Sequence, residues 1–334
     1  MRLKFIALGV LAAAAVGASA QNLNGAGATF PYPIYSKWFN EYSQQNSGVK
    51  INYQPIGSGG GIRQVTEGTV DFGAADVTMT DEQIAGAKIK VQPIPTVLGA
   101  VVPVYNLPGV NKELNFSGDV IADIYLGKIT NWNDSRIAKD NPGVNLPNQP
   151  ILPVYRSEAS GTTFIFTDFL SKVSPDWNSR VGKSTAVKWP TGIGQKGNEG
   201  VSGMVRQTPY SFGYVELIYA LQNKMSFGSV KNAAGKFVKA STDGVTAAAA
   251  ASKAMPPDFR VLITNAPGPT SYPISSFTWL LIPIHGSDPA KTKALTGFLT
   301  WMLDHGQSEA ATLSYAPLPK QVQDMVRKTI TQIK

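Results

Sequence analysis

The stretch that decides the fold is residues 24–76, NGAGATFPYPIYSKWFNEYSQQNSGVKINYQPIGSGGGIRQVTEGTVDFGAAD. After the proline that opens residues 31–42, apolar side chains recur at helical spacing. Residues 49–56 alternate apolar and polar side chains, which is typical of a strand. A second helix is expected from residue 62 to 67, and a short buried strand at 70–73 leads to Asp76. This alternation predicts an α/β fold with helices packed on a sheet.

The rest of the chain continues the same pattern. We expect residues 24–30 and 57–61 to be glycine-rich turns. Further buried strands are predicted at 97–105, 151–155, 213–215 and 277–284, and helices at 119–126, 163–170, 200–206, 291–303 and 321–333, with a hairpin and a helix within 227–260. The length of 334 residues suits two domains. No low-complexity linker separates two halves, so the chain is expected to cross between the domains more than once.

The first 20 residues have the pattern of a secretory signal peptide. Arg2 and Lys4 precede a short apolar run, and Ala18-Ser19-Ala20 is a cleavage sequence of small residues. The apolar run is too short to span a membrane. We therefore expect cleavage near Ala20 and a mature protein that is soluble in the periplasm.

Composition excludes several classes of site. The chain has no cysteine and two histidines, which removes thiolate catalysis, cysteine-ligated metals, disulfides and a histidine-rich metal centre. We expect neither a metal nor a cofactor. The net charge of +8 becomes +6 after cleavage, because 28 basic residues then face 22 acidic ones. The lysines are dispersed, so no nucleic-acid partner is expected.

Three turns that lead into helices carry small or hydroxyl residues. They contain Thr29-Phe30, Ser58 with the glycines after it, and Ser160-Gly161-Thr162. A helix N-terminus presents unpaired N–H groups and a partial positive charge, glycine permits close approach, and hydroxyls can donate. Ordinary helix caps are the alternative for any single turn. Three such turns together with Arg156 and Asp76 favour an oxyanion site.

Seven segments, in this order, resemble the PstS family, the phosphate-binding proteins of bacterial phosphate ABC transporters. They are GAGATFPYPIYSKW (25–38), INYQPIGSGGGIRQV (51–65), TVDFGAADV (69–77), DIYLGKITNWND (123–134), YRSEASGTTFIFTDFL (155–170), VKWPTGIGQKGNEGV (187–201) and FGYVE (212–216). The resemblance runs from about Asn24 to LSYAPLP at 313–319, nearly the whole mature chain.

The resemblance implies a two-lobed periplasmic-binding-protein fold of type II, in which a hinge joins two α/β lobes that close on one phosphate. Lobe I would be residues 21–97 plus 273–334, and lobe II residues 98–272. The protein would be a monomer that delivers phosphate to the permease and ATPase subunits of an ABC importer. The implied phosphate ligands are Thr29, Phe30, Ser58, Asp76, Arg156, Ser160, Gly161 and Thr162.

Three positions depart from the family pattern. Glu158 stands where an Asp is usual beside the ligand Arg, Gly59 replaces a common Ser, and Ala75 replaces another Ser. Glu158 is expected to support Arg156, either by holding its guanidinium or as a solvated pair. These departures concern the affinity and the local geometry of the Arg–carboxylate pair rather than the ligand set.

Asp76 is the residue expected to select the anion. Near neutral pH phosphate keeps a proton that an ionised Asp76 can accept in a hydrogen bond, whereas sulfate has none. A site built to pair a hydroxyl rejects an analogue that lacks it by roughly 10⁴–10⁵. Arg156 would supply the full positive charge with bidentate geometry. A receptor for sulfate or molybdate and an exported phosphatase are the alternatives, and the latter lacks an evident nucleophile–base pair or metal cluster.

Overall fold

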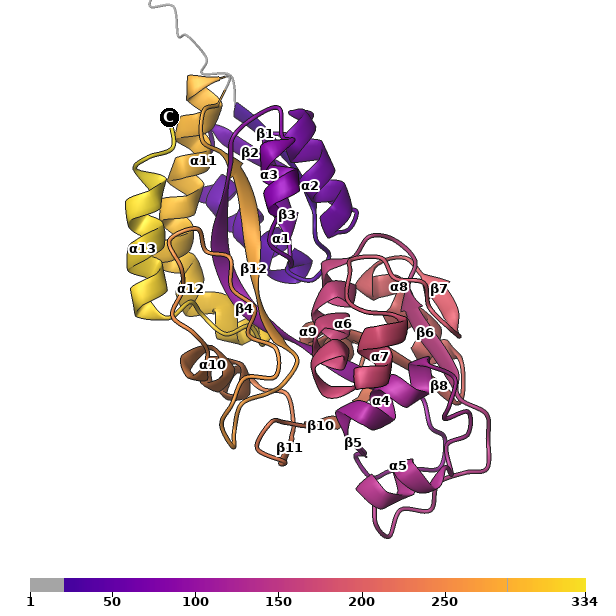
Figure 1. Ribbon diagram of the computed structural model, residues 1–334. Coiled ribbons are helices and arrows are strands. Elements are labelled where there is room, and N and C mark those ends of the chain that lie inside the picture. The colour runs from indigo at the N-terminus through magenta and orange to yellow at the C-terminus, as the bar shows by residue number, and fades with distance from the viewer. Residues whose placement is uncertain (1–20, 287) are drawn as a thin grey trace, which may run out of the picture.

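The computed structural model describes residues 21–286 and 288–334 (Figure 1). The predicted signal peptide, residues 1–20, lies outside the described residues. Helices and strands gather in two groups. The first contains the elements near both ends of the described chain, and the second contains most of its middle (Figure 1). This arrangement agrees with an α/β fold and with an intertwined chain.

The strands, in chain order, are β1 (Gln21–Gly27), β2 (Val49–Pro55), β3 (Phe72–Ala75), β4 (Val91–Tyr105), β5 (Asn115–Phe116), β6 (Leu152–Arg156), β7 (Ile193–Gln195), β8 (Ser211–Glu216), β9 (Ser226–Phe227), β10 (Ser229–Lys231), β11 (Phe237–Val238) and β12 (Ser275–Pro283).

The helices are α1 (Tyr32–Gln45), α2 (Ser58–Glu67), α3 (Asp81–Ala85), α4 (Gly118–Tyr125), α5 (Ser135–Asp140), α6 (Gly161–Val173), α7 (Pro175–Arg180), α8 (Gly197–Gln207), α9 (Leu217–Gln222), α10 (Thr242–Ala251), α11 (Pro289–Trp301), α12 (Gln307–Glu309) and α13 (Lys320–Ile330). A π-helical turn (Met302–Gly306) follows α11, and a 3₁₀ turn (Ala310–Leu313) follows α12.

One long strand, β4, joins the two groups. The strands follow the order β2-β1-β3-β12-β4-β8-β6-β7, and β9 also pairs with β4. Residues 91–100 of β4 pair with β12, and residues 101–105 pair with β8. Strand β4 therefore changes its principal partner between Ala100 and Val101, which is where the chain passes from one group to the other (Figure 1).

The expected turn at 24–30 was wrong, because residues 21–27 form strand β1. This strand pairs in parallel with β2 on one side and β3 on the other. Its small residues have low strand propensity, but the packing needs them. A Cβ on Gly25 would lie 2.2 Å from the Phe72 ring, so glycine lets the neighbouring strand carry a large aromatic residue.

Each group has its own aromatic core. In the first group, Phe39 packs against Tyr35, Tyr53, Phe72 and Phe298. In the second, Tyr125 packs against Phe166, Trp189, Phe212 and Tyr214. Aromatic pairs of this kind stabilise the packing within each group. The site residues predicted from the sequence lie where the two groups meet.

Candidate functional site

Ser58 and Asp76 meet at one edge of the first group. Gly57, with a φ of +95°, turns the chain from β2 into α2, which begins at Ser58. Asp76 follows β3 directly, and both side chains are buried. The Asp76 N–H donates to Ser58 Oγ at 3.1 Å, and Thr278 Oγ1 donates to Asp76 Oδ1 at 2.8 Å. Thr278, on β12, is a partner that the sequence reasoning missed.

Burial controls the charge of Asp76. Loss of water raises the pKa of this carboxyl to about 7, against the opposing effects of Thr278, Arg156 and Ser58. An aspartate with such a pKa is poised to share a proton near neutral pH. It suits a ligand that brings a proton of its own.

The N-terminus of α6 forms the facing wall. Ser160 caps this helix, because its Oγ accepts the Thr163 N–H at 3.1 Å. The N–H groups of Gly161 and Thr162 lie in the first turn, where a helix offers them no internal acceptor. Ser160, Gly161 and Thr162 are all buried. The predicted third turn is therefore the N-terminus of a helix, as expected for an oxyanion-binding site.

Arg156 ends strand β6 and is 3% exposed. Its Nε donates to Glu158 Oε1 at 2.9 Å and its Nη2 also pairs with that oxygen, while Nη1 donates to Thr162 Oγ1 at 3.1 Å. Glu158 Oε1 also accepts the Gly197 N–H at 3.1 Å. The ion pair expected between Arg156 and Glu158 is thus present. It is largely buried rather than solvated, since only 17% of the Glu158 side chain is exposed.

Thr29 and Phe30 follow strand β1. The Thr29 carbonyl accepts a hydrogen bond from Tyr219 Oη at 2.6 Å, and the Phe30 carbonyl accepts one from Tyr315 Oη at 2.6 Å. Both residues are buried. The two tyrosines hold successive carbonyls of this turn, which restrains the orientation of its peptide groups.

The two groups touch directly across the site. The Gly59 N–H donates to the Ala159 carbonyl at 3.0 Å. A Cβ on Gly161 would lie 2.4 Å from Ser58 Oγ and 2.6 Å from Asp76 Oδ2. The structure therefore brings the predicted residues of both groups together, and glycine at position 161 is what permits the approach.

Asn198 is a site residue that the sequence reasoning missed. It lies in the first turn of α8, and its Nδ2 donates to Thr29 Oγ1 at 2.8 Å and to Thr162 Oγ1 at 3.2 Å. It thereby links the first and third turns. Its place in the segment KGNEG, inside one of the seven family motifs, was the available signal.

Chemically, the site combines several donors with a carboxyl group. The guanidinium of Arg156, several hydroxyls and two helix N-termini surround the carboxyl of Asp76, while the Glu158 carboxylate is paired with Arg156. Such a site can hold a small oxyanion that retains a proton. Among residues 21–286 and 288–334, no group of three or more His, Asp or Glu residues could hold a metal ion.

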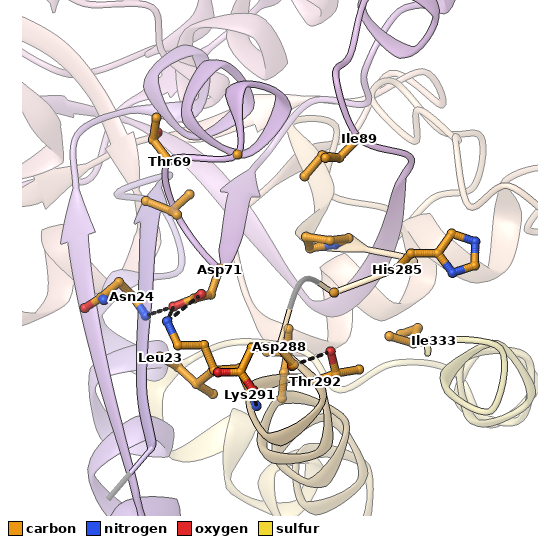
Figure 2. Close-up of a pocket in the computed structure, with 15 residues that line it drawn as sticks. Leu23, Asn24, Thr69, Asp71, Ile89, His285, Asp288, Lys291, Thr292 and Ile333 are labelled. Carbon is orange, nitrogen blue, oxygen red and sulfur yellow. Dashed lines mark hydrogen bonds and ion pairs between the residues drawn. The ribbon is translucent and has the colours of Figure 1, made fainter.

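A separate cavity of about 520 Å³ lies at the other end of β3 (Figure 2). Asp71, one residue before that strand, accepts from Lys291 Nζ at 3.0 Å and from the Asn24 N–H at 2.8 Å. Lys291 and Asp71 form an ion pair here (Figure 2), so the charge of Lys291 is already matched by a carboxylate of the protein. This cavity shares no lining residue with the site between the groups.

Comparison with known proteins finds one family throughout. Residues 12–305 match the family model described as the PBP superfamily domain. The chain is 47% identical to the phosphate-binding protein PstS of Pasteurella multocida, covering 92% of this chain and 89% of that one. It is 39% identical to the protein of the same name from Methanocaldococcus jannaschii, covering 92% and 85% respectively.

Solved structures show the same fold. A high-affinity periplasmic phosphate-binding protein called PfluDING, bound with phosphate, superposes with a TM-score of 0.74 at 22% identity, covering 92% of this chain and 93% of that one. A phosphate-binding protein from Stenotrophomonas maltophilia superposes with a TM-score of 0.70 at 20% identity, covering 92% and 94%. The two-lobed binding-protein fold expected from the sequence is confirmed.

Proposed function

The chain belongs to the PstS family of phosphate-binding proteins, within the PBP superfamily, and from this membership we propose that it captures inorganic phosphate between two lobes and delivers it to an ABC importer. The observation that carries the proposal is that Asp76 and Arg156 are both buried at one site, among hydroxyl and helix N-terminal donors. Phosphate near neutral pH suits both side chains, because its negative charge attracts Arg156 and its P–OH group can donate to Asp76.

The proposed ligands are the eight residues of the three turns and their neighbours. Arg156 supplies the positive charge, Asp76 accepts the P–OH proton, and the remaining donors come from backbone N–H groups and hydroxyls: Thr29, Phe30, Ser58, Ser160, Gly161 and Thr162. Glu158 supports this set by holding the guanidinium from the side away from Thr162. Dipoles of this kind stabilise a dehydrated anion without many full charges.

We propose two lobes with a hinge where β4 changes its partner, and the pairing of β4 with β12 and then with β8 supports this division. We assign residues 21–97 and 273–334 to lobe I and most of residues 98–272 to lobe II. Helix α10 contacts β4 and β12, and Arg260 pairs with Asp81. Residues 242–272 therefore rest partly on lobe I, and we place them at the boundary rather than inside lobe II.

The remaining parts of the proposal concern place and partners. A secreted chain with this ligand set would work in the periplasm as a monomer, and its closed form would dock on the permease of the importer, whose ATPase subunits drive uptake. We propose binding without catalysis, since transport requires phosphate to leave unchanged. No helix within the described residues is both long and apolar enough to span a membrane.

Calorimetric titration of residues 21–334, freed of bound phosphate by unfolding and refolding, tests the proposal. We expect one phosphate to bind per chain at pH 8 and sulfate at the same concentration to produce no binding heat. Saturable binding of sulfate or molybdate in preference to phosphate would favour another oxyanion receptor. Hydrolysis of a chromogenic phosphate ester, abolished by Ser58→Ala, would favour a phosphatase.

A further inference from the structure

Asn198 occupies a central position between the lobes. Gly197, with a φ of +72°, turns the chain into α8, and Asn198 is fully buried one residue later. Its side-chain oxygen accepts the Glu216 N–H at 3.0 Å, at the end of β8 and beside the point where β4 changes its partner. Its amide nitrogen reaches Thr29 from lobe I and Thr162 from lobe II.

The orientation of this amide is fixed by its partners. A backbone N–H is a donor only, so the atom of Asn198 that faces Glu216 must be the oxygen. The nitrogen then faces the two threonine hydroxyls, and each of its two hydrogens has one acceptor. The amide of Asn198 is therefore fully hydrogen-bonded.

These hydrogen bonds limit what the hydroxyls of Thr29 and Thr162 can still bind. A hydroxyl has one hydrogen to donate and two lone pairs that accept. Thr162 Oγ1 already accepts from Arg156 Nη1 and from Asn198 Nδ2, both of which are donors only. Thr29 Oγ1 accepts from the side chain of Asn198 at 2.8 Å and from its backbone N–H at 3.4 Å. Each hydroxyl keeps only its hydrogen for a further partner.

We propose that Asn198 is a positioning residue that sets Thr29 and Thr162 as hydrogen-bond donors to the anion and ties both to the hinge through Glu216. This inference rests on the proposed function. The amide sets the Thr162 hydroxyl within lobe II before the ligand arrives, which lowers the cost of organising the site during binding. It also makes the Thr29–Thr162 link depend on lobe closure, because the two hydroxyls belong to different lobes.

The substitution Asn198→Asp separates this role from simple packing. A carboxylate accepts where the amide donates, so it would draw both hydroxyl hydrogens toward itself and away from phosphate. The titratable groups near position 198 include Arg156, which bonds Thr162, and Glu158, which bonds the Gly197 N–H. They also include Glu199, Tyr219, which bonds both Glu199 and the Thr29 carbonyl, and Glu216, whose pKa is raised well above its usual value by burial. Protonation of the new carboxyl at lower pH returns one donor to the site.

The experiment compares phosphate affinity of the full mature chain between pH 5.5 and 8 for wild type, Asn198→Asp and Asn198→Ala. The matched control is Asn141→Asp, because Asn141 is also buried and makes three amide hydrogen bonds, far from the site. We expect Asn198→Ala to weaken binding about 10- to 100-fold, as the loss of two oriented donors implies. Asn198→Asp should weaken it further at pH 8, and its deficit relative to wild type should shrink as the pH falls.

Wild-type affinity in both site variants, or a deficit for Asn198→Asp that is the same at every pH and matches the Asn141→Asp control, would overturn the inference. Failure of wild type to bind phosphate would instead overturn the proposed function. If Asn198→Asp does not fold, a double-mutant cycle of Asn198→Ala with Thr162→Ala decides. Losses that are less than additive support the inference, because Asn198 acts through the hydroxyl, and additive losses refute it.

Discussion

The pKa of Asp76 makes closure of the empty protein depend on pH. In the structure, where the two groups touch, burial raises this pKa from an ordinary value of 3.8 to about 7. We expect an open form, in which water reaches Asp76, to keep the ordinary value. At about 1.36 kcal/mol for each pH unit, that difference is worth roughly 4 kcal/mol against closing on an ionised Asp76. Asp76→Asn removes the charge while keeping the size of the side chain. The variant should therefore close more readily than wild type when no phosphate is present.

The direction of this pH dependence follows from the proton that Asp76 takes up when the protein closes. Below pH 3.8 Asp76 is protonated in the open and the closed forms, so closing carries no pH-dependent penalty. Between about 4 and 7 the open form is ionised and the closed form is not, so closing takes up a proton and weakens as the pH rises. Between pH 5 and 8 the closure constant of wild type should fall about 100-fold, and that of Asp76→Asn should stay constant.

Fluorescence energy transfer between two dyes measures this closure. The chain has no cysteine, so Ala85→Cys on α3 and Asn178→Cys on α7, both exposed, label one site on each lobe. Asp71→Asn is the matched control, because Asp71 lies at the other end of β3 and pairs with Lys291. It should keep the wild-type pH profile. Identical profiles for wild type and Asp76→Asn would refute the reasoning.

Two further substitutions test the contact between the lobes, and a third tests the contribution of the Arg156 guanidinium to phosphate binding. Gly161→Ala should weaken phosphate binding at least 10-fold, because its Cβ would lie 2.4 Å from Ser58 Oγ on the opposite lobe. Gly203→Ala is the control: no atom lies within 4 Å of its new Cβ, so it should bind phosphate as wild type does in the same titration. Gly59→Ser places a Cβ 2.4 Å from the Ala159 Cβ, so phosphate binding should weaken, and adding Ala159→Gly should recover it. Equal affinities for the single and double variants would show that this contact does not matter. Arg156→Ala should reduce phosphate affinity about 100-fold, as expected when a charged hydrogen-bond donor is lost, and an affinity close to that of wild type would place Arg156 outside the site.

The alternation of elements could be predicted because hydrophobic periodicity is local. Helix α1 and strand β2 were found from spacing alone, and the N-terminus of α6 from its hydroxyl and glycine residues. Strand β1 was missed since its glycines look like a turn until the Phe72 ring is placed above Gly25. Its strand character comes from pairing with β2 and β3, which local propensity does not contain.

The site residues also divide into those that a local sequence pattern reveals and those that depend on long-range contacts. Asp76, Arg156 and the three turns carry chemistry that can be recognised in the residues themselves. The role of Asn198 could not be recognised in this way, because it arises from a hydrogen bond to Thr29 that spans 169 positions of sequence. The packing of the two groups against each other brings that amide between two hydroxyls. Long-range partners of this kind are the part of the site that sequence patterns cannot supply.

The most direct test of the central claim is the ratio of phosphate to sulfate affinity in wild type and in Asp76→Asn, measured by calorimetry at pH 8. If the carboxylate selects the anion that carries a proton, wild type should prefer phosphate by roughly 10⁴ or more. The variant should narrow that preference at least 100-fold, because its amide can donate to sulfate. An unchanged ratio would contradict the account, since Asp76 would then have no part in selecting the ligand.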